Sequence, residues 1–379
     1  MKKIFWFGLI GLLLFEVCNV YFIMPMPGSQ QMNSIKLAYF LYHWRWFFRI
    51  LFIAMIGIGF FRSSWKRKWL LLFPIGIVAT IAYMTNFEMA ADAIFYQPAS
   101  IKMAGASTNK VDSNRLVIGV VNNGEAKAYP IRFIGYHHLL IDTIGNKPVL
   151  ITYCTVCRTG RVYEPTVNGS QEQFRLVGMD HFNAMIEDVS TKSWWRQATG
   201  EAIAGKLSGN QLPEIFSTQT SLAQWLALNP RSLIMQADSS SINSYDTSMN
   251  YELGKSRKEL TGTDTLSWKN KSWVIGIKPG NERRAYDWNK LKTNRIIQDL
   301  AGNTPVVLVL AKDGKSFFAF ERPNQEAIFE LKEDTLVLNK YHFKITGQGI
   351  DTSYSLKPIP AYQEFWHSWQ TFNPITSKN

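Results

Sequence analysis

Two of the three cysteines in this chain stand three positions apart, in the stretch YCTVCRT at residues 153–159. Cys154 follows the apolar run VLITY, and the residues after Cys157 return at once to a strand-forming composition. The pair is therefore predicted to lie in a turn between two strands, and not in the first turn of a helix. Such a turn presents two sulfur atoms from one side, which is the usual half of a zinc or copper site.

A metal ion at this turn needs further ligands from His, Asp, Glu or Met side chains, because Cys18 lies in an apolar segment that is predicted to be in the membrane. Adjacent residues point to opposite faces of a strand, so only one of His137 and His138 is expected to face the cysteines. We expect one zinc or copper ion as the cofactor. The expected ligands are Cys154, Cys157, His137 and His181, with His138 and Asp180 as second choices.

A thiol–disulfide oxidoreductase is the first alternative, with Cys154 and Cys157 as its catalytic pair. Thiols outside the cytoplasm tend to oxidise unless a metal binds them or a partner reduces them. The helix N-terminus that activates a thioredoxin cysteine is missing here, although Arg158 and Arg161 can partly replace its charge. A purely structural disulfide is a poor explanation, because closing so short a loop contributes only about 2 kcal/mol.

The second alternative is a non-catalytic module that holds a small ligand or a partner protein in a tryptophan-lined cleft. The segment DVSTKSWWRQATGEAIAG at 188–205 carries two adjacent indoles and several polar side chains. An aromatic pair of this kind also suits a hydrophobic core. The predicted pocket residues are Arg158, Asp188, Trp194, Gln197 and Glu201.

An internal repeat predicts the elements that position these residues. Residues 116–154 align with 273–311 without a gap, and 212–230 align with 356–374. Each copy opens with a predicted hairpin, continues into a buried apolar strand, and closes with a Trp-bearing helix that ends at Asn-Pro. Ala311 and Gly314 stand where the first copy has its two cysteines, so the scaffold does not require thiols.

The predicted fold is mainly β, a β-rich α+β class, with two tandem pseudo-symmetric repeats after an N-terminal three-helix transmembrane region. The expected domains are 1–87 as the membrane region, 110–235 as the first repeat, 236–267 as a linker and 268–375 as the second repeat. The linker prediction rests on a composition rich in Ser and Thr and poor in apolar residues.

Three apolar segments at the N-terminus are predicted to span a membrane, at about 4–24, 37–61 and 69–87. Basic residues precede the first segment and cluster at 62–68, between the second and the third. The positive-inside rule then places the N-terminus and this turn in the cytoplasm. The expected location is the cytoplasmic (inner) membrane, with multiple spans and a large extracytoplasmic or periplasmic C-terminal domain.

The charge of the chain does not suggest nucleic acid as a partner. Nine of its 41 Lys and Arg residues and one of its 29 Asp and Glu residues lie in 1–87, so most of the net charge of +12 reflects topology. The expected partners are the lipid bilayer and a membrane or extracytoplasmic metalloprotein, for example one that is being assembled.

Several motifs resemble a known family, the domain-of-unknown-function family number 3179. Its hallmark is a Tyr-Cys-Pro-Leu-Cys-Gly segment followed by an Asp…Ser-x-Trp-x-Gln…Gly-Glu-Ala block. The chain matches the hallmark at Cys154 and Cys157 and has Thr155 for Pro and Arg158 for Gly. The matches to the second block are Asp188, Ser193, Trp194, Gln197, Gly200, Glu201 and Ala202, and His137 and Asp142 match upstream. The resemblance covers roughly 110–375 and implies no particular activity.

Overall fold

The computed structural model describes residues 1–98 and 100–379, which divide into two compact units. Unit 1 consists of Met1–Tyr96, Glu172–Arg196 and Glu201–Gln211, and unit 2 of Gln97–Gln171, Gln197–Gly200 and Leu212–Asn379. These units cut across the predicted bounds of the first repeat. Most of 172–211 groups with the N-terminal helices, because its strands form a sheet of their own that packs on one of those helices.

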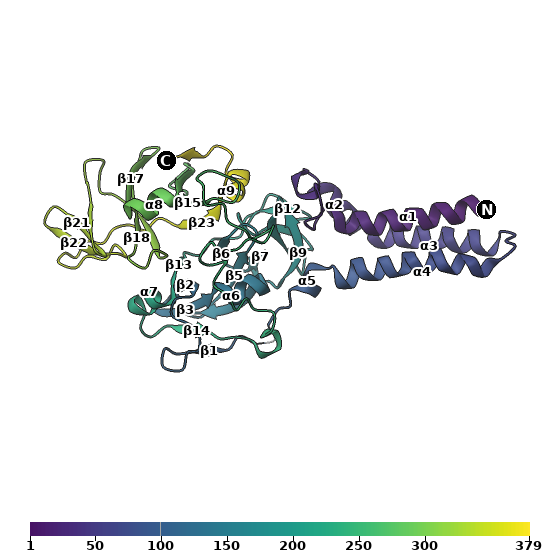
Figure 1. Cartoon of the computed structure of the whole chain (residues 1–379), viewed down its shortest axis with the longest axis horizontal. Coiled ribbons are helices and arrows are strands. Elements are labelled where there is room, and N and C mark those ends of the chain that lie inside the picture. The colour runs from purple at the N-terminus through teal and green to yellow at the C-terminus, as the bar shows by residue number, and fades with distance from the viewer. Residues whose placement is uncertain (99) are drawn as a thin grey trace. The chain divides into compact units, whose positions relative to one another are not determined.

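Apolar helices make up the first part of unit 1, and the long ones lie side by side (Figure 1). The helices are α1 (Lys2–Tyr21), α2 (Ile35–His43), α3 (Arg45–Phe61), α4 (Leu72–Tyr83) and the short α5 (Ala91–Ile94). Tighter or wider turns join them: the 3-10 turns η1 (Ser29–Gln31) and η2 (Lys68–Leu71) and the π-helical turn η3 (Met84–Glu88). Small residues let α1 approach α3, since a Cβ on Gly8 or Gly59 would collide with the facing helix.

Two helical segments are long and apolar enough to cross a membrane, Lys2–Tyr21 and Lys68–Glu88. Helices α2 and α3 meet at a bend of 61° and would make a third crossing if the bent pair is one span. Each of the three predicted apolar segments thus falls on helix, and the second is broken at Trp44.

The sheet of unit 1 has the order β12-β11-β10-β9 and is antiparallel throughout. Its strands are β9 (Phe174–Asp180), β10 (Asn183–Asp188), β11 (Trp194–Arg196) and β12 (Ala202–Ala204). Trp194 lies in the cluster that joins this sheet to α2, with its ring 5.1 Å from that of Tyr39 in a T-shaped contact.

The first half of unit 2 contains two main sheets. One has the order β1-β14-β3-β2-β13 and the other β4-β5-β6. Their strands are β1 (Met103–Ala104), β2 (Leu116–Asn122), β3 (Glu125–Pro130), β4 (Leu139–Ile144), β5 (Lys147–Cys154), β6 (Thr159–Tyr163), β13 (Thr218–Ser221) and β14 (Leu233–Met235). Helix α6 (Ile131–His137) follows β3, helix α7 (Leu222–Leu228) follows β13, and β7 (Thr166–Val167) pairs with β8 (Ser170–Gln171).

The second half of unit 2 has sheets of the same kind, with the orders β23-β15-β16-β24 and β17-β18-β19. Their elements are β15 (Trp273–Ile277), β16 (Arg284–Asp287), α8 (Trp288–Asn294), β17 (Ile296–Ala301), β18 (Thr304–Leu310), β19 (Phe317–Glu321), β23 (Ala361–Phe365), α9 (Trp366–Phe372) and β24 (Ser377–Lys378). A further sheet, β20 (Glu330–Lys332), β21 (Thr335–Leu338) and β22 (Tyr341–Lys344), follows β19.

The two halves agree in strand direction as well as in strand order. The strand before the closing helix pairs antiparallel in both (β13 with β2, β23 with β15), and the last strand pairs parallel (β14 with β3, β24 with β16). A residue with positive φ ends the first helix of each half, His138 at 62° and Arg295 at 59°.

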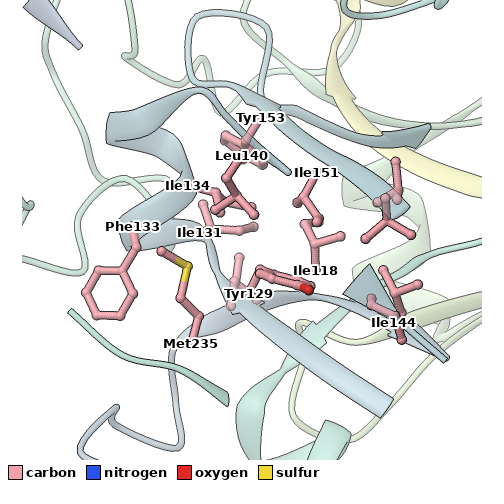
Figure 2. Packing of buried hydrophobic residues seen from close by; sticks show 14 of the residues in the cluster. Ile118, Tyr129, Ile131, Phe133, Ile134, Leu140, Ile144, Ile151, Tyr153 and Met235 are labelled. Carbon is pink, nitrogen blue, oxygen red and sulfur yellow. The ribbon is translucent and has the colours of Figure 1, made fainter. Parts of the chain in front are cut away.

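The core of the first half holds the end of β5 in place. Figure 2 shows Ile151 and Tyr153 from this strand together with Ile118 from β2 and Ile134 from α6. Residues 149–154 are all buried, which explains why β5 is a continuous apolar run and not an alternating one. Because the strand is covered on both faces, the turn that follows it starts inside the protein.

The segment predicted as a linker, 236–267, is packed against unit 2. Tyr245 and Glu252 are buried in it, and η4 (Ser239–Ser241) forms a short turn. Arg115 donates from one guanidinium nitrogen to Glu252 Oε1 at 2.6 Å, and the backbone amide of Leu116 donates to Glu252 Oε2 at 2.6 Å. This carboxylate therefore ties the segment to the start of β2.

The same glycine–tryptophan contact in both halves yields a test of the packing. A Cβ on Gly119 would collide with the Trp225 ring, and one on Gly276 with the Trp369 ring. We expect Gly119→Ala and Gly276→Ala each to lower the free energy of unfolding by roughly 1–3 kcal/mol through overpacking. Denaturant unfolding followed by tryptophan fluorescence measures this loss. Gly105→Ala, where a Cβ meets no atom within 4 Å, is the matched control and should leave the midpoint unchanged.

Candidate functional site

The cysteine pair lies in the turn between β5 and β6, which is the position that the sequence predicted. Cys154 is the last residue of β5 and pairs with Thr159, the first residue of β6. Both cysteines are buried, with 1% and 0% of their surface exposed. We call residues 154–158 the cysteine turn.

Residues far away in the sequence hold the backbone of the cysteine turn. The Tyr251 hydroxyl donates to the carbonyl of Thr155 at 3.0 Å, and the Lys271 ammonium donates to the carbonyl of Val156 at 3.1 Å. The backbone amide of Phe365 donates to the carbonyl of Cys157 at 2.9 Å. Three successive carbonyls of the turn are thus bound by the 236–267 segment and by the second half of unit 2.

Arg158 anchors the end of the turn. Its φ of 58° is left-handed, and its side chain is completely buried. The guanidinium stacks on Trp273 at 3.5 Å and donates to the carbonyls of Tyr251 (2.8 Å) and Glu252 (3.0 Å) and to Gln363 Oε1 (3.1 Å). A flat guanidinium suits this combination of stacking and several hydrogen bonds, which a lysine cannot reproduce.

Lys271 brings a positive charge to the two sulfur atoms. Burial lowers the pKa of Lys271 below its ordinary value, and its interaction with Cys157, followed by that with Cys154, opposes this shift. Because an electrostatic interaction is mutual, the same ammonium stabilises a thiolate on either cysteine. No motif or spacing in the sequence singled out Lys271.

His367 lies against the same turn. Its Nε2 is 3.2 Å from the carbonyl of Val156, to which it donates as a neutral imidazole. Burial, and then the charge of Lys271, lower the pKa of His367 to about 4. This side chain is therefore neutral at pH 7 and adds no positive charge at the cysteine turn.

Neither of the two adjacent histidines lies on a strand. The prediction that only one of them faces the cysteines assumed a strand at this position, and that assumption was wrong. His137 is the last residue of α6, and His138 is the left-handed residue that follows it. His137 Nε2 is 2.7 Å from the Tyr245 hydroxyl, and His138 Nδ1 is 2.9 Å from the carbonyl of Tyr153. His138 thus binds the residue directly before Cys154. Its pKa is lowered to about 4, mainly by burial.

His181 and Asp180 belong to unit 1 and bind each other there. His181 Nδ1 is 2.5 Å from Asp180 Oδ1, and Arg196 donates to Asp180 Oδ2 at 2.6 Å. Burial alone would raise the pKa of Asp180, but the bonds from His181 and Arg196 lower it below its ordinary value. Across residues 1–98 and 100–379, no three His, Cys, Asp or Glu side chains are grouped so as to hold a metal ion.

Two of the predicted pocket residues, Arg158 and Gln197, lie at the hairpin that carries the cysteine turn. Gln197 donates from its amide to Thr152 Oγ1 at 3.0 Å and to the carbonyl of Thr159 at 3.1 Å. It therefore links β5 to β6 immediately beside the turn.

The other three predicted pocket residues lie in unit 1. Trp194 is buried and donates from its indole to Glu187 at 2.9 Å, and its neighbour Trp195 donates to Asp188 at 2.8 Å. Glu201 pairs with Arg196 at 3.2 Å. The indoles take part in packing the sheet, so a cleft lined by them stays a prediction.

The family model described as "Protein of unknown function (DUF3179)" matches residues 95–376. The matched region begins after the apolar helices and contains the cysteine turn, both halves of unit 2 and the sheet of unit 1. It confirms the family resemblance read from the motifs. No curated protein and no solved structure matches the chain.

The buried imidazoles predict how stability depends on pH. His138 and His367 have pKa values of about 4 in the folded protein, below the ordinary 6.5, so the unfolded chain binds protons that the folded protein does not. The free energy of unfolding should fall as the pH drops from about 6.5 to 4, by about 3 kcal/mol for each group.

Urea unfolding across this pH range measures the effect, and His138→Asn is the informative variant. Asparagine tolerates the left-handed backbone and does not titrate, so this variant should lose its share of the pH dependence. An unchanged slope in the variant would contradict the assignment to His138.

Proposed function

The chain belongs to the family described as Protein of unknown function (DUF3179), and we propose that Cys154 and Cys157 act in it as a thiol–disulfide redox couple. One observation carries this proposal: the Lys271 ammonium donates to the carbonyl of Val156, between the two cysteines, at 3.1 Å, in a turn whose three successive carbonyls are all bound. The family description assigns no activity, so the proposal rests on the site.

The proposed chemistry is exchange with a disulfide of a partner protein. A thiolate of the cysteine turn attacks the partner disulfide and forms a mixed disulfide, releasing one partner thiolate. The second cysteine then attacks the mixed disulfide, which closes the 154–157 bond and releases the other thiolate. The pair loses two electrons and two protons in total, and the partner gains two electrons and becomes a dithiol. Lys271 stabilises the attacking thiolate, as cations do in other reactive cysteine sites.

Metal handling is the alternative, and two sulfur atoms from one buried turn favour it. A site for one zinc or copper ion would need another ligand, since a structural zinc takes four. His181 would have to give up a bond to Asp180 or to Asn33, because both of its ring nitrogens are bound. The redox proposal keeps the ligand set of the cysteine turn as it stands and requires that the buried turn opens to a partner, and for this reason we place it first.

We also propose that the two halves of unit 2 are tandem copies of one ancestral unit. The matching strand orders, strand directions and left-handed helix ends support this proposal, as does the gapless alignment of 116–154 with 273–311. In the second copy Ala311 and Gly314 form the equivalent turn, with the amide of Gly314 donating to the carbonyl of Ala311 at 3.0 Å. Because that turn forms without sulfur, the cysteines of the first copy are best explained by chemistry.

The proposed location is a membrane with several crossings and the β-rich part on the extracytoplasmic side. The two apolar helical segments and the bent pair between them supply the crossings. The basic residues before α1 and at 62–68 are expected to stay in the cytoplasm. Exchange with partner disulfides suits the opposite side, because proteins form and keep disulfides in an oxidising environment.

Reporter fusions test this topology. A reporter placed at about residue 65 should read cytoplasmic, and one at the C-terminus should read extracytoplasmic, because an odd number of crossings separates the N-terminus from unit 2. The two fusions reading the same side would contradict the topology, and a cytoplasmic C-terminus would also remove the oxidising compartment.

Thiol titration on the full-length protein tests the redox couple. After equilibration in glutathione buffers, the wild type should contain a reducible bond between Cys154 and Cys157, and Cys154→Ser or Cys157→Ser should abolish it. Lys271→Met should slow alkylation of the reduced pair, because it removes a positive charge that favours the thiolate. Lys269→Met, at an exposed lysine of the same segment, is the matched control, and Cys18→Ser removes the background thiol.

Metal analysis of the same samples separates the alternatives. Stoichiometric zinc or copper that is lost in both cysteine variants would overturn the redox proposal in favour of metal handling. If the samples contain neither a reducible bond nor a bound metal, the non-catalytic binding module becomes the better explanation.

A further inference from the structure

Unit 1 contains a polar cavity at the end of its apolar helices. The cavity has a volume of about 280 Å³ and lies where α1 ends and where η3 leads into α5. Apolar side chains such as Val20, Ile23 and Met89 form part of its wall. The polar lining residues are Asn19, Tyr42, Arg45, Thr85, Asn86, Asp92 and Arg175.

A buried ion pair lies next to this cavity inside the helix bundle. Arg49 donates to Glu16 at 2.7 and 2.9 Å, and Glu16 is only 2% exposed. Asn86 links the pair to the cavity, since it donates to Glu16 Oε2 at 2.8 Å and lines the cavity wall. Charged groups among apolar helices are costly and mark functional sites by default. Here the pair satisfies itself, so the groups that remain for a ligand lie in the cavity.

Arg45 is the cation available to a ligand. The other arginine of the wall, Arg175, pairs with Glu187 at 2.8 Å and with Asp92 at 3.0 Å. Arg45 stacks on Tyr42 at 4.0 Å and donates to its carbonyl. Among residues 1–98 and 100–379, no carboxylate lies within 4.0 Å of the Arg45 guanidinium. The cavity therefore offers a site for a negative group.

Asn19 supplies an acceptor that needs a donor. Its side chain is 8% exposed, and in the described part of the chain its Oδ1 has no hydrogen-bond partner. Leaving a buried amide oxygen unpaired costs about 1–3 kcal/mol. A ligand that carries both a negative group and a hydrogen-bond donor would satisfy Arg45 and Asn19 together.

The surroundings of Arg45 indicate a membrane interface. Arg45 stands at the bend between α2 and α3, and its neighbours Trp44, Trp46 and Phe47 are all exposed. Tryptophan collects at the level of lipid head groups, and apolar helix surface continues beyond it. At the level of the head groups, the cavity can receive the head group of a lipid whose acyl chains lie along the apolar helices.

We propose that this cavity binds the head group of a zwitterionic phospholipid, with the phosphate on Arg45 and the ammonium on Asn19. The proposal rests on the membrane placement proposed above and is independent of the thiol chemistry. Basic pockets between membrane helices bind phosphate head groups in this way. The ammonium supplies the hydrogen-bond donor that Asn19 needs, and a lipid that carries a phosphate alone lacks this donor.

Native mass spectrometry of the full-length protein in detergent tests the proposal, with lipids of identical acyl chains as probes. The expected order of affinity is phosphatidylethanolamine, then phosphatidic acid, then diacylglycerol. Arg45→Gln should weaken the binding of phosphatidylethanolamine by about ten- to hundredfold, which is the loss expected for one hydrogen bond between charged groups. Arg45→Lys should lose less, because it keeps the charge. Asn19→Leu should remove the preference for phosphatidylethanolamine over phosphatidic acid.

Arg62→Gln is the control variant, because Arg62 is a basic residue outside the cavity lining. This variant should bind phosphatidylethanolamine as tightly as the wild type. Equal binding of diacylglycerol, or Arg45→Gln binding as tightly as Arg62→Gln, would overturn the proposal. Soluble phosphoethanolamine that binds as tightly as the lipid would overturn it in favour of a soluble ligand. Reporter fusions and thiol titration are separate measurements, so a failure here is distinguishable from a failure of the membrane or redox proposals.

Discussion

The buried ion pair between Arg161 and Glu364 is the contact on which the architecture of unit 2 depends. Arg161 lies on β6 in the first half and Glu364 on β23 in the second, and each is 1% exposed. Thr159 donates to the same carboxylate at 3.0 Å, and Ser368 donates to its other oxygen at 3.0 Å. Burial opposes the charge of Arg161, but Glu364 raises the pKa of the guanidinium above its ordinary value. Removing one partner of such a pair typically costs 3–5 kcal/mol, because it leaves an uncompensated buried charge.

This ion pair also brings the second half to the cysteine turn. Glu364 precedes Phe365, whose amide binds the carbonyl of Cys157, and His367 follows two residues later. Lys271 lies over the Phe365 ring at 4.8 Å and meets the turn from the same side. The half that lacks cysteines therefore supplies Lys271, Phe365 and His367 to the turn that carries them. If the two halves are copies, one has kept the sulfur chemistry and the other has become its support.

Unit 1 depends on a different constraint, the need to satisfy polar groups among apolar helices. Glu16, Arg49 and Asn86 come from α1, α3 and η3 and bind one another, so their charges and amides fix how these helices pack. The π-helical turn at Met84–Glu88 belongs to this arrangement, and such turns often mark functional sites. One turn further along α1, Asn19 is left with an unbonded oxygen in the cavity wall.

The sequence by itself determined the family, the β-rich class, the apolar helices and the position of the cysteine turn. These features follow from local patterns: an apolar run ending at Cys154, long stretches without charge, and motifs read in order. It also placed His137 and His138 in the half that carries the cysteines, and His138 binds the carbonyl of Tyr153, directly before Cys154. Their elements were not predicted correctly, since a short helix and a left-handed residue stand where a strand was expected.

Only the tertiary structure decided what surrounds the sulfur atoms. Lys271, Phe365 and His367 lie more than a hundred positions from Cys154, and no spacing rule connects them to it. It also decided that His181 and Asp180 bind each other in unit 1, and that the Ser-rich segment 236–267 is packed through Glu252 and Tyr251. The physical reason is the same in each case. A buried charge or carbonyl must find a partner, but which distant residue provides it depends on how the strands pack, and that information is not local in the chain.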